Sequence, residues 1–567
     1  MPRWGGWAGA VLACLLAGRA FAAAPCTAWV FFADKPDGTG GRIAWQADGR
    51  HAPAAQLDLP VDPAYVARVA ALGADLRFTS CWLNGVSVSA TAGQLETLAR
   101  QAFVRAVRPV RAFRRSEPEA PAPLAPGAGK SVLLPDYGVS FEQLAQIGIV
   151  YLHQLGYDGT GIRVGVLDNG FHYHDHPALR GLRVVAEHDF LNGDDDVADQ
   201  SAQPVTGDET RSTQNIHGAQ VLSLLAGNDP GQFMGGAPGA EYILAKTEDD
   251  DTELPAEEDR WVAGLEWAAA QGASVVNSSL GYNLFDDGSG YTYQDMDGAT
   301  AVTTLAAEAA ARKGIVVVAA AGNEGRTSWR YVTAPADGAD VVSVGSVDMP
   351  YAAGEAPVIS VTSSRGPTSD GRIKPDVVAP GEGVVVADIR GLGYVRSNGT
   401  SFAAPLVSAA CALLREVHPE WTPAQMLEAL HRTATDLGDP GPDTIYGWGQ
   451  VNALRASGLE VGLPTVPLVG QPYPNPVRGD VVYFPLQAVE REEVTLSLFD
   501  LSGQLVYQQT VPLLAGDHTS PLAAVCWDVA RTEEQRGTPL ANGVLYYQVR
   551  TTAAARTGSI ALVRARR

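Results

Sequence analysis

Three residues whose types can act together in nucleophilic catalysis stand in distinctive settings along this 567-residue chain. Asp168 ends the apolar run of GVLDNGF, His217 opens HGAQVLSLLAG, and Ser401 begins the small-residue segment of SNGTSFAAPLVSAACALL. A serine hydroxyl is a weak nucleophile that needs a base, and the base needs a carboxylate to hold its tautomer. The three residues together predict an Asp, His and Ser catalytic set.

Each residue also has a simpler interpretation when taken alone. The dipeptide Asn169-Gly170 is a strong turn signal, so Asp168 could merely flank a turn. A single histidine at a helix start is more often structural, and Ser401 could be an ordinary helix cap. One observation supports catalysis. Ser401 stands at the start of a predicted helix, whose N–H groups and dipole stabilise the negative charge of a tetrahedral intermediate. Pro405 is compatible with this helix because it falls in the early turns, where proline is tolerated.

The elements that would position these residues alternate between strand and helix from residue 136 to 458. Apolar runs such as GIRVGVL, EYILAK, ASVVNSSLG and GIVVVAAAGN take turns with helical stretches such as WVAGLEWAAAQG and ATAVTTLAAEAAARKG. This pattern predicts an α/β domain with a parallel sheet between two helical layers. Ligand sites in such sheets lie at the carboxyl ends of the strands, and Asp168, Gly281 and Asn323 each follow an apolar run.

Residues 1–24 have the charged start, apolar middle and Ala20-Phe21-Ala22 pattern of a secretory signal peptide. Residues 25–115 then read as a small α+β unit in β-α-β-α-β order, with strands in AWVFF, LRFTSCWLNGVSVSA and FVRAVRPV. Tyr65, Val69 and Leu72 predict its first helix, and Thr91 with Gln94 gives a capping-box signature for the second. Residues 116–135 are rich in Pro, Ala and Glu and read as an exposed linker.

The C-terminal part changes character after a second linker at 459–472. Residues 473–567 carry short alternating strands such as VTLSLFD and VLYYQVR, separated by Ser-Gly and Asn-Gly turns. This pattern predicts a small β-sandwich.

The net charge and the cysteine content of the chain indicate which partners it can bind and in which compartment it works. The formal net charge of −22 argues against nucleic acid, because phosphate binding needs a basic face. Past the signal peptide only four cysteines remain, too few for a disulfide scaffold and without the spacing of a zinc site. Cys26 and Cys81 lie in one N-terminal region and could pair in an oxidising compartment, whereas Cys411 reads as a buried thiol. A secreted or cell-surface, extracellular protein fits these features.

The region from DNGF to YGWGQVN resembles a known family. Its order Asp, His, Ser is that of subtilisin. The blocks DNGF, HGAQV and GTSFAAP resemble the three signature blocks of the subtilases, and so do GGAPGAEYILAK, SSLG, AAAGNEG, SSRGPTSDGRIKPDVVAPG and YGWGQVN, in the same order. The resemblance implies a subtilisin-like three-layer fold and a secreted serine endopeptidase that cuts proteins and peptides through an acyl-enzyme. It also implies that chemistry needs no cofactor.

The resemblance carries further roles onto matching positions. Asn323 matches the side-chain donor of the oxyanion hole, and Glu324 sits at a pocket rim where a carboxylate would tolerate basic or polar side chains. The segment Ser279, Leu280 and Gly281 matches the strand that pairs with the substrate backbone, and Ala320, Ala321 and Gly322 match the opposite wall of the primary pocket. Residues 25–115 resemble the family's ferredoxin-like prosegment, which acts as an intramolecular inhibitor in a precursor.

The C-terminal region resembles a second family. QPYPNPVRGD at 471–480, LFDLSGQLV at 498–506 and LANGVLYYQVRT at 540–551 resemble the sorting domain of the type IX secretion system. The resemblance implies the secretion machinery as a partner. A carbohydrate-binding or immunoglobulin-like domain would show similar turns, and that alternative stays open.

Metal chemistry and a silent scaffold are the competing hypotheses. HYHDHP at 172–177 gathers His172, His174, Asp175 and His176 as a metal-dependent hydrolase would, although it is one residue short of the metallo-β-lactamase pattern. The acid clusters at 194–196 and 249–251 have the oxygen ligands that a structural calcium prefers, while solvated loops explain them more simply. A catalytically inactive adhesion protein with this fold would not need Asp168, His217, Ser401 and Asn323 together.

Overall fold

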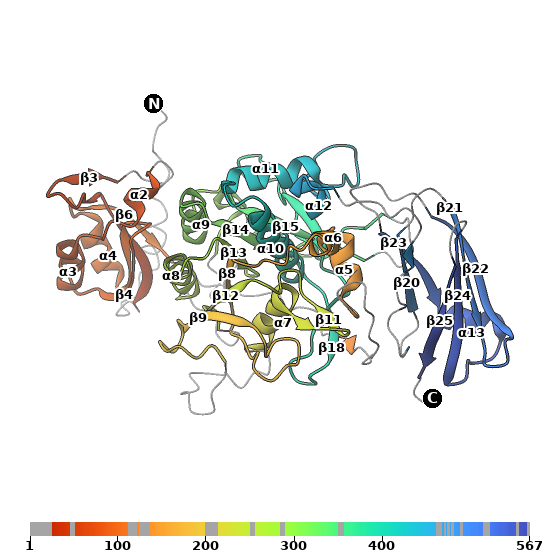
Figure 1. The fold of residues 1–567 in the computed structure, drawn as a ribbon. Helices are drawn as coiled ribbons and strands as arrows, with labels where there is room; N and C mark the ends of the chain where they lie inside the picture. The colour runs from red at the N-terminus through yellow and green to blue at the C-terminus, as the bar shows by residue number, and fades with distance from the viewer. Residues whose placement is uncertain are drawn as a thin grey trace. The chain divides into compact units, whose positions relative to one another are not determined.

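The computed structural model describes residues 25–45, 52–110, 122–123, 137–198, 214–249, 256–283, 290–349, 356–460, 468–469, 472, 477, 481–487, 492–513, 522–551 and 555–563 (Figure 1). The predicted signal peptide and nearly all of the predicted linker at 116–135 lie outside these ranges. By its internal contacts the chain forms two compact units, residues 1–47 with 55–111 and residues 48–54 with 112–567.

A seven-stranded parallel sheet forms the centre of the larger unit. Its order is β16-β15-β14-β13-β8-β12-β9, and the strands span Val377–Pro380, Val342–Val347, Val316–Ala320, Val275–Ser278, Arg163–Asp168, Glu241–Lys246 and Arg183–Asp189. Strands such as β14, with the sequence VVVAA, are buried at every position because helices cover both faces of the sheet. The predicted α/β class is confirmed.

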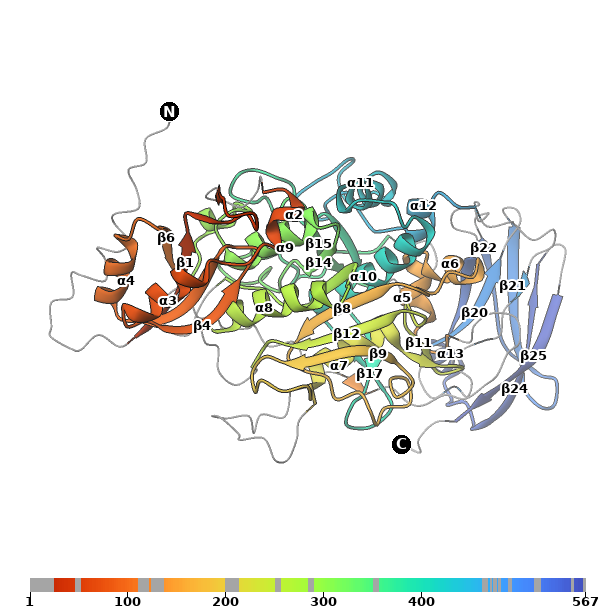
Figure 2. The same ribbon diagram turned by 60° about the vertical axis from the view of Figure 1, so that its left-hand side comes forward.

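Two layers of helices enclose this sheet, as both ribbon views show (Figures 1 and 2). On one side, α7 (Ile216–Ala226) packs against α10 (Thr400–Val417), and α10 lies along β13 to β16. On the other side, α8 (Ala256–Ala270) packs against α9 (Val302–Arg312), with β8 and β12 beneath α8. Among the described helices α10 has the length and apolar composition of a membrane span, but 89% of it is buried, as in the core helix of a folded domain.

Shorter elements complete this unit. The helices are α5 (Phe141–Gln146), α6 (Ile149–Gln154), η1 (Tyr293–Asp295), α11 (Pro423–Thr433) and α12 (Ala453–Ser457), and the strands are β7 (Ala122–Pro123), β10 (Asn228–Asp229), β11 (Phe233–Met234), β17 (Val384–Ala387) and β18 (Tyr394–Ser397).

The N-terminal unit is built on an antiparallel sheet of order β4-β5-β1-β6, with strands Asp75–Ser80, Gly85–Ala90, Cys26–Phe32 and Val104–Pro109. Helices α3 (Pro63–Ala71) and α4 (Ala92–Ala99) contribute to its apolar core, and α2 (Ala54–Leu57), β2 (Asp34–Pro36) and β3 (Arg42–Ala44) are short. The capping box is present as predicted: Thr91 Oγ1 accepts from the Gln94 N–H, and Gln94 Oε1 accepts from the Thr91 N–H.

One expectation for this unit is wrong. LRFTSCWLNGVSVSA was read as one strand region, but it is the hairpin of β4 and β5, turned at residues 81–84. Asn84 adopts a left-handed backbone there with φ of 48°, which asparagine tolerates better than most residues. The sheet therefore has four strands.

The cysteines of the N-terminal unit do not pair with each other. Cys26 lies opposite Ala90 at one end of β5, while Cys81 follows Ser80, which lies opposite Gly85 at the other end. Five residues of strand separate these ends by about 17 Å, whereas a disulfide needs Cα atoms within about 7 Å. Cys411 on α10 is buried as predicted, and burial raises the pKa of its thiol to about 12, so that it stays protonated.

The C-terminal region contains two antiparallel sheets. One has the order β19-β20-β23 (Leu468–Val469, Val481–Gln487, Leu522–Asp528), and the other β22-β21-β24-β25 (Leu505–Leu513, Glu492–Phe499, Gly543–Arg550, Ala555–Leu562). Alternate residues of both sheets share one apolar core. A helix that the alternation did not predict, α13 (Val529–Arg536), follows β23, and Asp528 caps its N-terminus by accepting from the Arg531 N–H.

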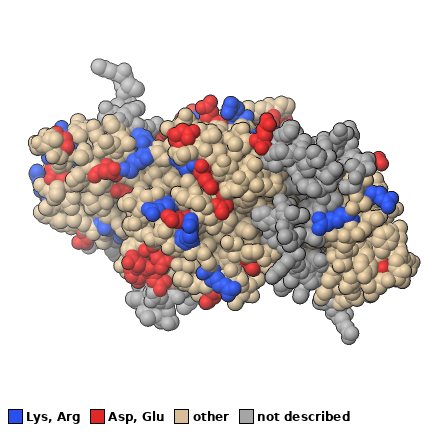
Figure 3. Space-filling model, in the orientation of Figure 1, with Lys and Arg blue, Asp and Glu red and all other residues tan. Residues whose placement is uncertain are grey.

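Charged side chains are mixed on the surface. On the face drawn in Figure 3, the described basic residues are interrupted by acidic and uncharged ones and form no continuous stripe. Several acidic side chains gather at the lower left of that view.

A buried charge cluster joins α11 to the edge of the main sheet. Asp376, which directly precedes β16, accepts from Lys374 Nζ at 2.5 Å and from the Ser343 N–H at 2.8 Å. Its other oxygen accepts from His431 Nε2 at 2.9 Å, and the His431 ring stacks on Trp448. Burial acts to raise the pKa of the Asp376 carboxyl, but Lys374 and His431 outweigh it and hold this pKa below its ordinary value.

We expect this cluster to make stability depend on acid pH. Because the pKa of Asp376 is lower in the folded than in the unfolded protein, its contribution is present above the unfolded value of about 3.9 and is lost as pH falls through the folded value. In urea denaturation, Asp376→Asn should lower the free energy of unfolding at pH 7 by about 3 kcal/mol, because Lys374 keeps a buried charge without its partner. The variant should also lose less stability than the parent between pH 5 and 2.

The matched control is the double variant Lys374→Met with Asp376→Leu. It removes both charges and should recover most of the stability at pH 7. Parallel pH profiles for the parent protein and Asp376→Asn would show that Asp376 does not carry the acid dependence.

Candidate active site

The first half of the site is a buried pair of side chains. Asp168 is the last residue of β8 and His217 the second residue of α7, and they are 0% and 6% exposed. Asp168 Oδ1 lies 2.7 Å from His217 Nδ1 and also accepts from the Asn169 N–H at 2.8 Å. His217 Nε2 has no hydrogen-bond partner among the described residues. The ring is therefore held at one nitrogen and leaves the other for a reacting group.

A second contact brings α7 this close to β8. Asn169 Oδ1 accepts from the Gly218 N–H at 2.9 Å, which satisfies one of the N–H groups that a helix start leaves unpaired. Gly218 is needed for the approach, since a β-carbon there would lie 2.3 Å from Gly170 O and 3.0 Å from the Asp168 β-carbon. Asn169 thus acts as a remote cap of α7 and forms no hairpin.

The second half of the site is the N-terminus of α10. Ser401 is the second residue of this helix, and its hydroxyl donates to Ser279 O at 3.0 Å. Pro405 has no N–H to donate to the Ser401 carbonyl, as a helix would otherwise require. The Ser279 hydroxyl donates to that carbonyl instead, at 2.8 Å. Ser401 is consequently fixed to the segment that follows β13.

Asn323 is held beside the same helix start. Its carboxamide oxygen accepts from the Thr400 N–H at 3.0 Å and from Thr400 Oγ1 at 3.1 Å. The Gly322 N–H donates to the same Thr400 hydroxyl at 3.2 Å. Among the hydrogen bonds of the described residues none uses the carboxamide nitrogen of the half-buried Asn323, so that it remains able to donate.

The sheet explains why these residues meet. In the paired strands, Ser278 of β13 lies opposite Leu167 of β8 on one side and Ala319 of β14 on the other. The segments that follow therefore leave the same edge: Asp168, then Ser279, Leu280 and Gly281, then Ala320, Ala321 and Gly322. The described contacts include no hydrogen bond between Ser401 and His217, whose ring centroid lies 5.6 Å from that of Phe402.

Four supporting residues were missed from the sequence. Asn277 Nδ2 donates to the Ser279 hydroxyl at 3.0 Å, and the Ser408 hydroxyl donates to Asn277 Oδ1 at 2.8 Å, so the two residues tie β13 to α10. Asn277 stands inside the otherwise apolar VVNS strand, and that signal could have identified it. Asn169 was read as a turn residue, and nothing local in the sequence singled out Thr400.

The histidines near Asp168 do not converge on a common point. His172 Nε2 lies 3.4 Å from Asp175 Oδ2, whereas the buried His176 Nε2 lies 2.8 Å from Gly393 O. Burial lowers the pKa of His176, with Gly393 acting against it, which favours the neutral ring. In the described ranges no three His, Cys, Asp or Glu side chains are grouped as a metal ion requires. The metal-hydrolase hypothesis gains no support from this arrangement.

The described residues of the two acid clusters expected to bind calcium form no such group either. Asp195 Oδ1 lies 2.8 Å from His188 Nδ1, and Asp194 Oδ1 accepts from the Asp196 N–H at 3.0 Å. In the second acid cluster, residues 250–251 lie outside the described part of the chain.

Comparison with protein-family models identifies two regions. Residues 159–449, about half of the chain, match the Subtilase family. Residues 45–122 match the Peptidase S8 propeptide domain of Bacteroidota, which starts later and ends later than the predicted 25–115 unit.

Individual relatives agree with these matches. The chain is 32% identical to alkaline elastase YaB of Bacillus sp. over 307 residues, which cover 53% of this chain and 66% of the relative. It is 31% identical to subtilisin BL of Lederbergia lenta over 306 residues, covering 54% and 94%. It is likewise 31% identical to subtilisin E of Bacillus subtilis, covering 57% and 71%.

A solved structure supports the fold. Fervidolysin from Fervidobacterium pennivorans, a keratinolytic enzyme related to subtilisin, aligns with a TM-score of 0.56 at 20% identity, covering 96% of this chain and 79% of that one. Together with the family match over the catalytic region, these findings show that the chain belongs to the subtilase family and is a subtilisin-like serine endopeptidase with an S8 propeptide domain.

Proposed function

We propose that this endopeptidase cuts proteins through Asp168, His217 and Ser401, with Asn323 in the oxyanion hole. The observation that carries the proposal is the 2.7 Å contact between Asp168 Oδ1 and His217 Nδ1 inside a buried site. A buried carboxylate held against one ring nitrogen sets the histidine tautomer and stabilises the imidazolium that forms when the ring accepts a proton.

The reaction then follows from these positions. His217 Nε2 takes the proton of Ser401 Oγ as the oxygen attacks the carbonyl carbon of the scissile bond. The Ser401 N–H and the Asn323 amide nitrogen donate to the oxyanion. His217 returns its proton to the leaving amine, the acyl-enzyme remains on Ser401, and water activated by His217 releases it. In the substrate complex the Ser401 hydroxyl turns from Ser279 O towards His217, as catalytic hydrogen bonds often tighten only then.

The substrate backbone would be bound by strand addition. Ser279, Leu280 and Gly281 extend β13 beyond the sheet edge, and an extended peptide can pair with such a segment through main-chain hydrogen bonds. Ala320, Ala321 and Gly322 would form the opposite wall of the primary pocket.

We further propose that the enzyme is made as a precursor. The unit of residues 25–115 would be a ferredoxin-like intramolecular inhibitor, joined by the linker at 116–135 to the catalytic domain at 136–458. The S8 propeptide match at 45–122 supports this assignment.

Secretion belongs to the same proposal. Residues 1–24 would direct export, and residues 473–567, after a linker at 459–472, would be a β-sandwich that the type IX machinery recognises. Supporting features are the two antiparallel sheets with a shared core and the hairpin of β21 and β22 built on the DLSG turn, where Asp500 accepts from the Ser502 and Gln504 N–H groups.

The nucleophile is tested with Ser401→Ala. Casein hydrolysis and labelling by a fluorophosphonate probe should both disappear, because the variant lacks the Ser401 oxygen that carries the acyl group in the proposed mechanism. The control is Ser140→Ala, which removes a different buried hydroxyl that bonds to Met234 and should leave both signals. Hydrolysis that survives Ser401→Ala would refute the serine mechanism.

The oxyanion hole is tested with Asn323→Asp. The carboxylate can still accept from Thr400 but no longer donates, so kcat should fall about 10²- to 10³-fold with little change in KM. Asn452→Asp is the matched control, because Asn452 Oδ1 only accepts from the Arg455 N–H at the start of α12. An unchanged kcat in Asn323→Asp would exclude Asn323 as the donor.

The positioning role of Asn169 is tested with Asn169→Ala. The change leaves the Gly218 N–H without its acceptor, so α7 should lose its fixed distance from β8 and kcat per labelled site should fall about 10-fold. Gln143→Ala is the control, since Gln143 also makes buried contacts with a backbone, at Val385, away from the site. If both variants lose kcat equally, general destabilisation explains the effect.

A further inference from the structure

Thr333 stands between the two glycines that end the proposed pocket walls. A β-carbon built on Gly281 would lie 2.3 Å from Thr333 Oγ1 and 3.3 Å from its Cβ. A β-carbon built on Gly322 would lie 3.0 Å from Thr333 Oγ1 and 3.1 Å from its Cγ2. The two glycines therefore face one and the same side chain, which is 3% exposed.

Backbone contacts fix Thr333 against both walls. Its N–H donates to Ala321 O at 3.1 Å on the β14 side. The next residue, Ala334, exchanges two hydrogen bonds with Tyr282 on the β13 side, at 2.8 and 3.2 Å. The segment thus crosses from one wall to the other and closes the space between them at one end.

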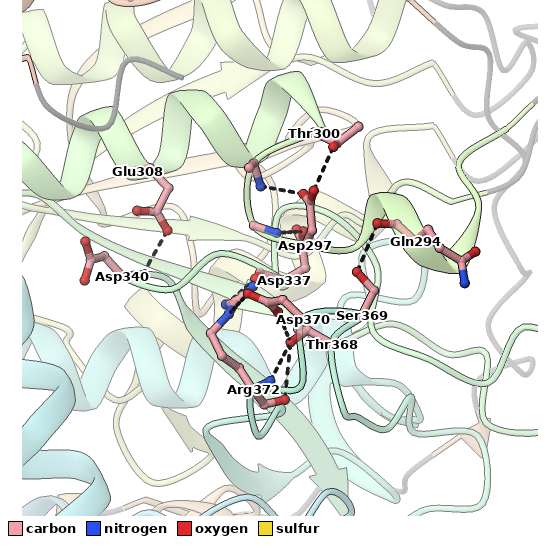
Figure 4. Close-up of polar contacts among 12 residues, drawn as sticks. Gln294, Asp297, Thr300, Glu308, Asp337, Asp340, Thr368, Ser369, Asp370 and Arg372 are labelled. Atoms are coloured by element: carbon pink, nitrogen blue, oxygen red, sulfur yellow. Dashed lines mark hydrogen bonds and ion pairs between the residues drawn. The ribbon is translucent and has the colours of Figure 1, made fainter. Parts of the chain in front are cut away.

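Hydrogen bonds also fix the segment from Thr333 to Asp337 at its far end (Figure 4). The Asp337 carboxylate accepts from the Gly298 N–H at 2.8 Å and from Thr304 Oγ1 at 2.5 Å. Arg372 donates to Asp337 O at 2.7 Å and to Asp370 Oδ2 at 2.8 Å. Because these contacts anchor the segment four residues from Thr333, that residue cannot withdraw without breaking buried hydrogen bonds.

In the described part of the chain, the carboxylate expected to pair with a basic substrate side chain already has a partner of its own. Glu324, the carboxylate expected at the pocket rim, accepts from Thr327 Oγ1 at 2.8 Å within its own loop. At the Gly322 end, a second hydroxyl adjoins the glycine, since a β-carbon there would lie 2.8 Å from Ser364 Oγ. The groups at the closed end are short hydroxyl side chains.

We propose that Thr333 forms the floor of the primary specificity pocket and restricts the residue before the scissile bond to small uncharged side chains such as alanine and serine. This inference rests on the proposed function, because it takes the segments 279–281 and 320–322 as the pocket walls. A long or aromatic side chain entering between the walls would meet a β-branched residue that is fixed on both sides. Discrimination of about 10- to 200-fold per excluded group is what such a contact supplies.

The test compares peptide p-nitroanilides Ala-Ala-Pro-X, with X as Ala, Leu, Phe or Lys. The parent enzyme should have a kcat/KM for Ala at least about 10-fold above that for Phe or Lys. In Thr333→Gly the ratio of Phe to Ala should rise about 10-fold or more, while Thr333→Val, which keeps the shape, should keep the parent ratio. Thr333→Ala should give an intermediate ratio and serves if the glycine variant does not fold.

Two results would overturn this inference while leaving the proposed mechanism intact. One is a parent enzyme that cleaves after Phe as well as after Ala. The other is an unchanged ratio in Thr333→Gly or Thr333→Ala that still labels at Ser401 with the fluorophosphonate. A parent enzyme that hydrolyses none of the four peptides and no casein would instead refute the proposed function, and this inference with it.

Discussion

The contact between Asp168 and His217 is the constraint on which the geometry of the site depends. A carboxylate at the end of a buried strand is unfavourable unless hydrogen bonds offset its burial. Here the imidazole and the Asn169 N–H both bond to Oδ1 of Asp168, whereas Oδ2 has no partner among the described residues. The contact requires the start of α7 to touch the end of β8, and only a glycine at 218 allows that approach. This contact thereby places at the sheet edge an imidazole whose Nε2 has no hydrogen-bond partner among the described residues.

The helix that carries Ser401 is attached to the sheet because one of its internal hydrogen bonds, from residue 405 to the Ser401 carbonyl, cannot form. Pro405 leaves the Ser401 carbonyl without its helical donor, and the Ser279 hydroxyl donates to it instead. Asn277 then links Ser279 to Ser408, about two turns beyond Ser401 along α10. A regular helix would have satisfied that carbonyl internally and needed no partner on β13. The irregular turn therefore joins the serine to the segment proposed to bind substrate.

The sequence was a good guide wherever a residue's setting is local. Apolar runs revealed the parallel strands, and Thr91 with Gln94 revealed a helix start, because strand burial and capping depend on near neighbours. Asn169 was read as a turn residue, because its role depends on Gly218, which lies far away in the sequence. The β4–β5 hairpin was read as one strand, because its form depends on the pairing of Phe78 with Ser87. Thr333 gave no signal at all, because its position between Gly281 and Gly322 arises only when two strand ends lie side by side.

The strand ends and the loop from 331 to 337 have different roles in the proposed site. The strand ends fix the side chains of the proposed site, because β8, β13 and β14 pair in register within the buried sheet and cannot shift independently. The loop from 331 to 337 bonds to the segments that follow two of those ends, and it is anchored by Asp337 and Arg372 rather than by the proposed catalytic residues. A change in this loop can therefore alter which side chain fits while leaving the contact between Asp168 and His217 in place, so selectivity and chemistry depend on separate sets of contacts.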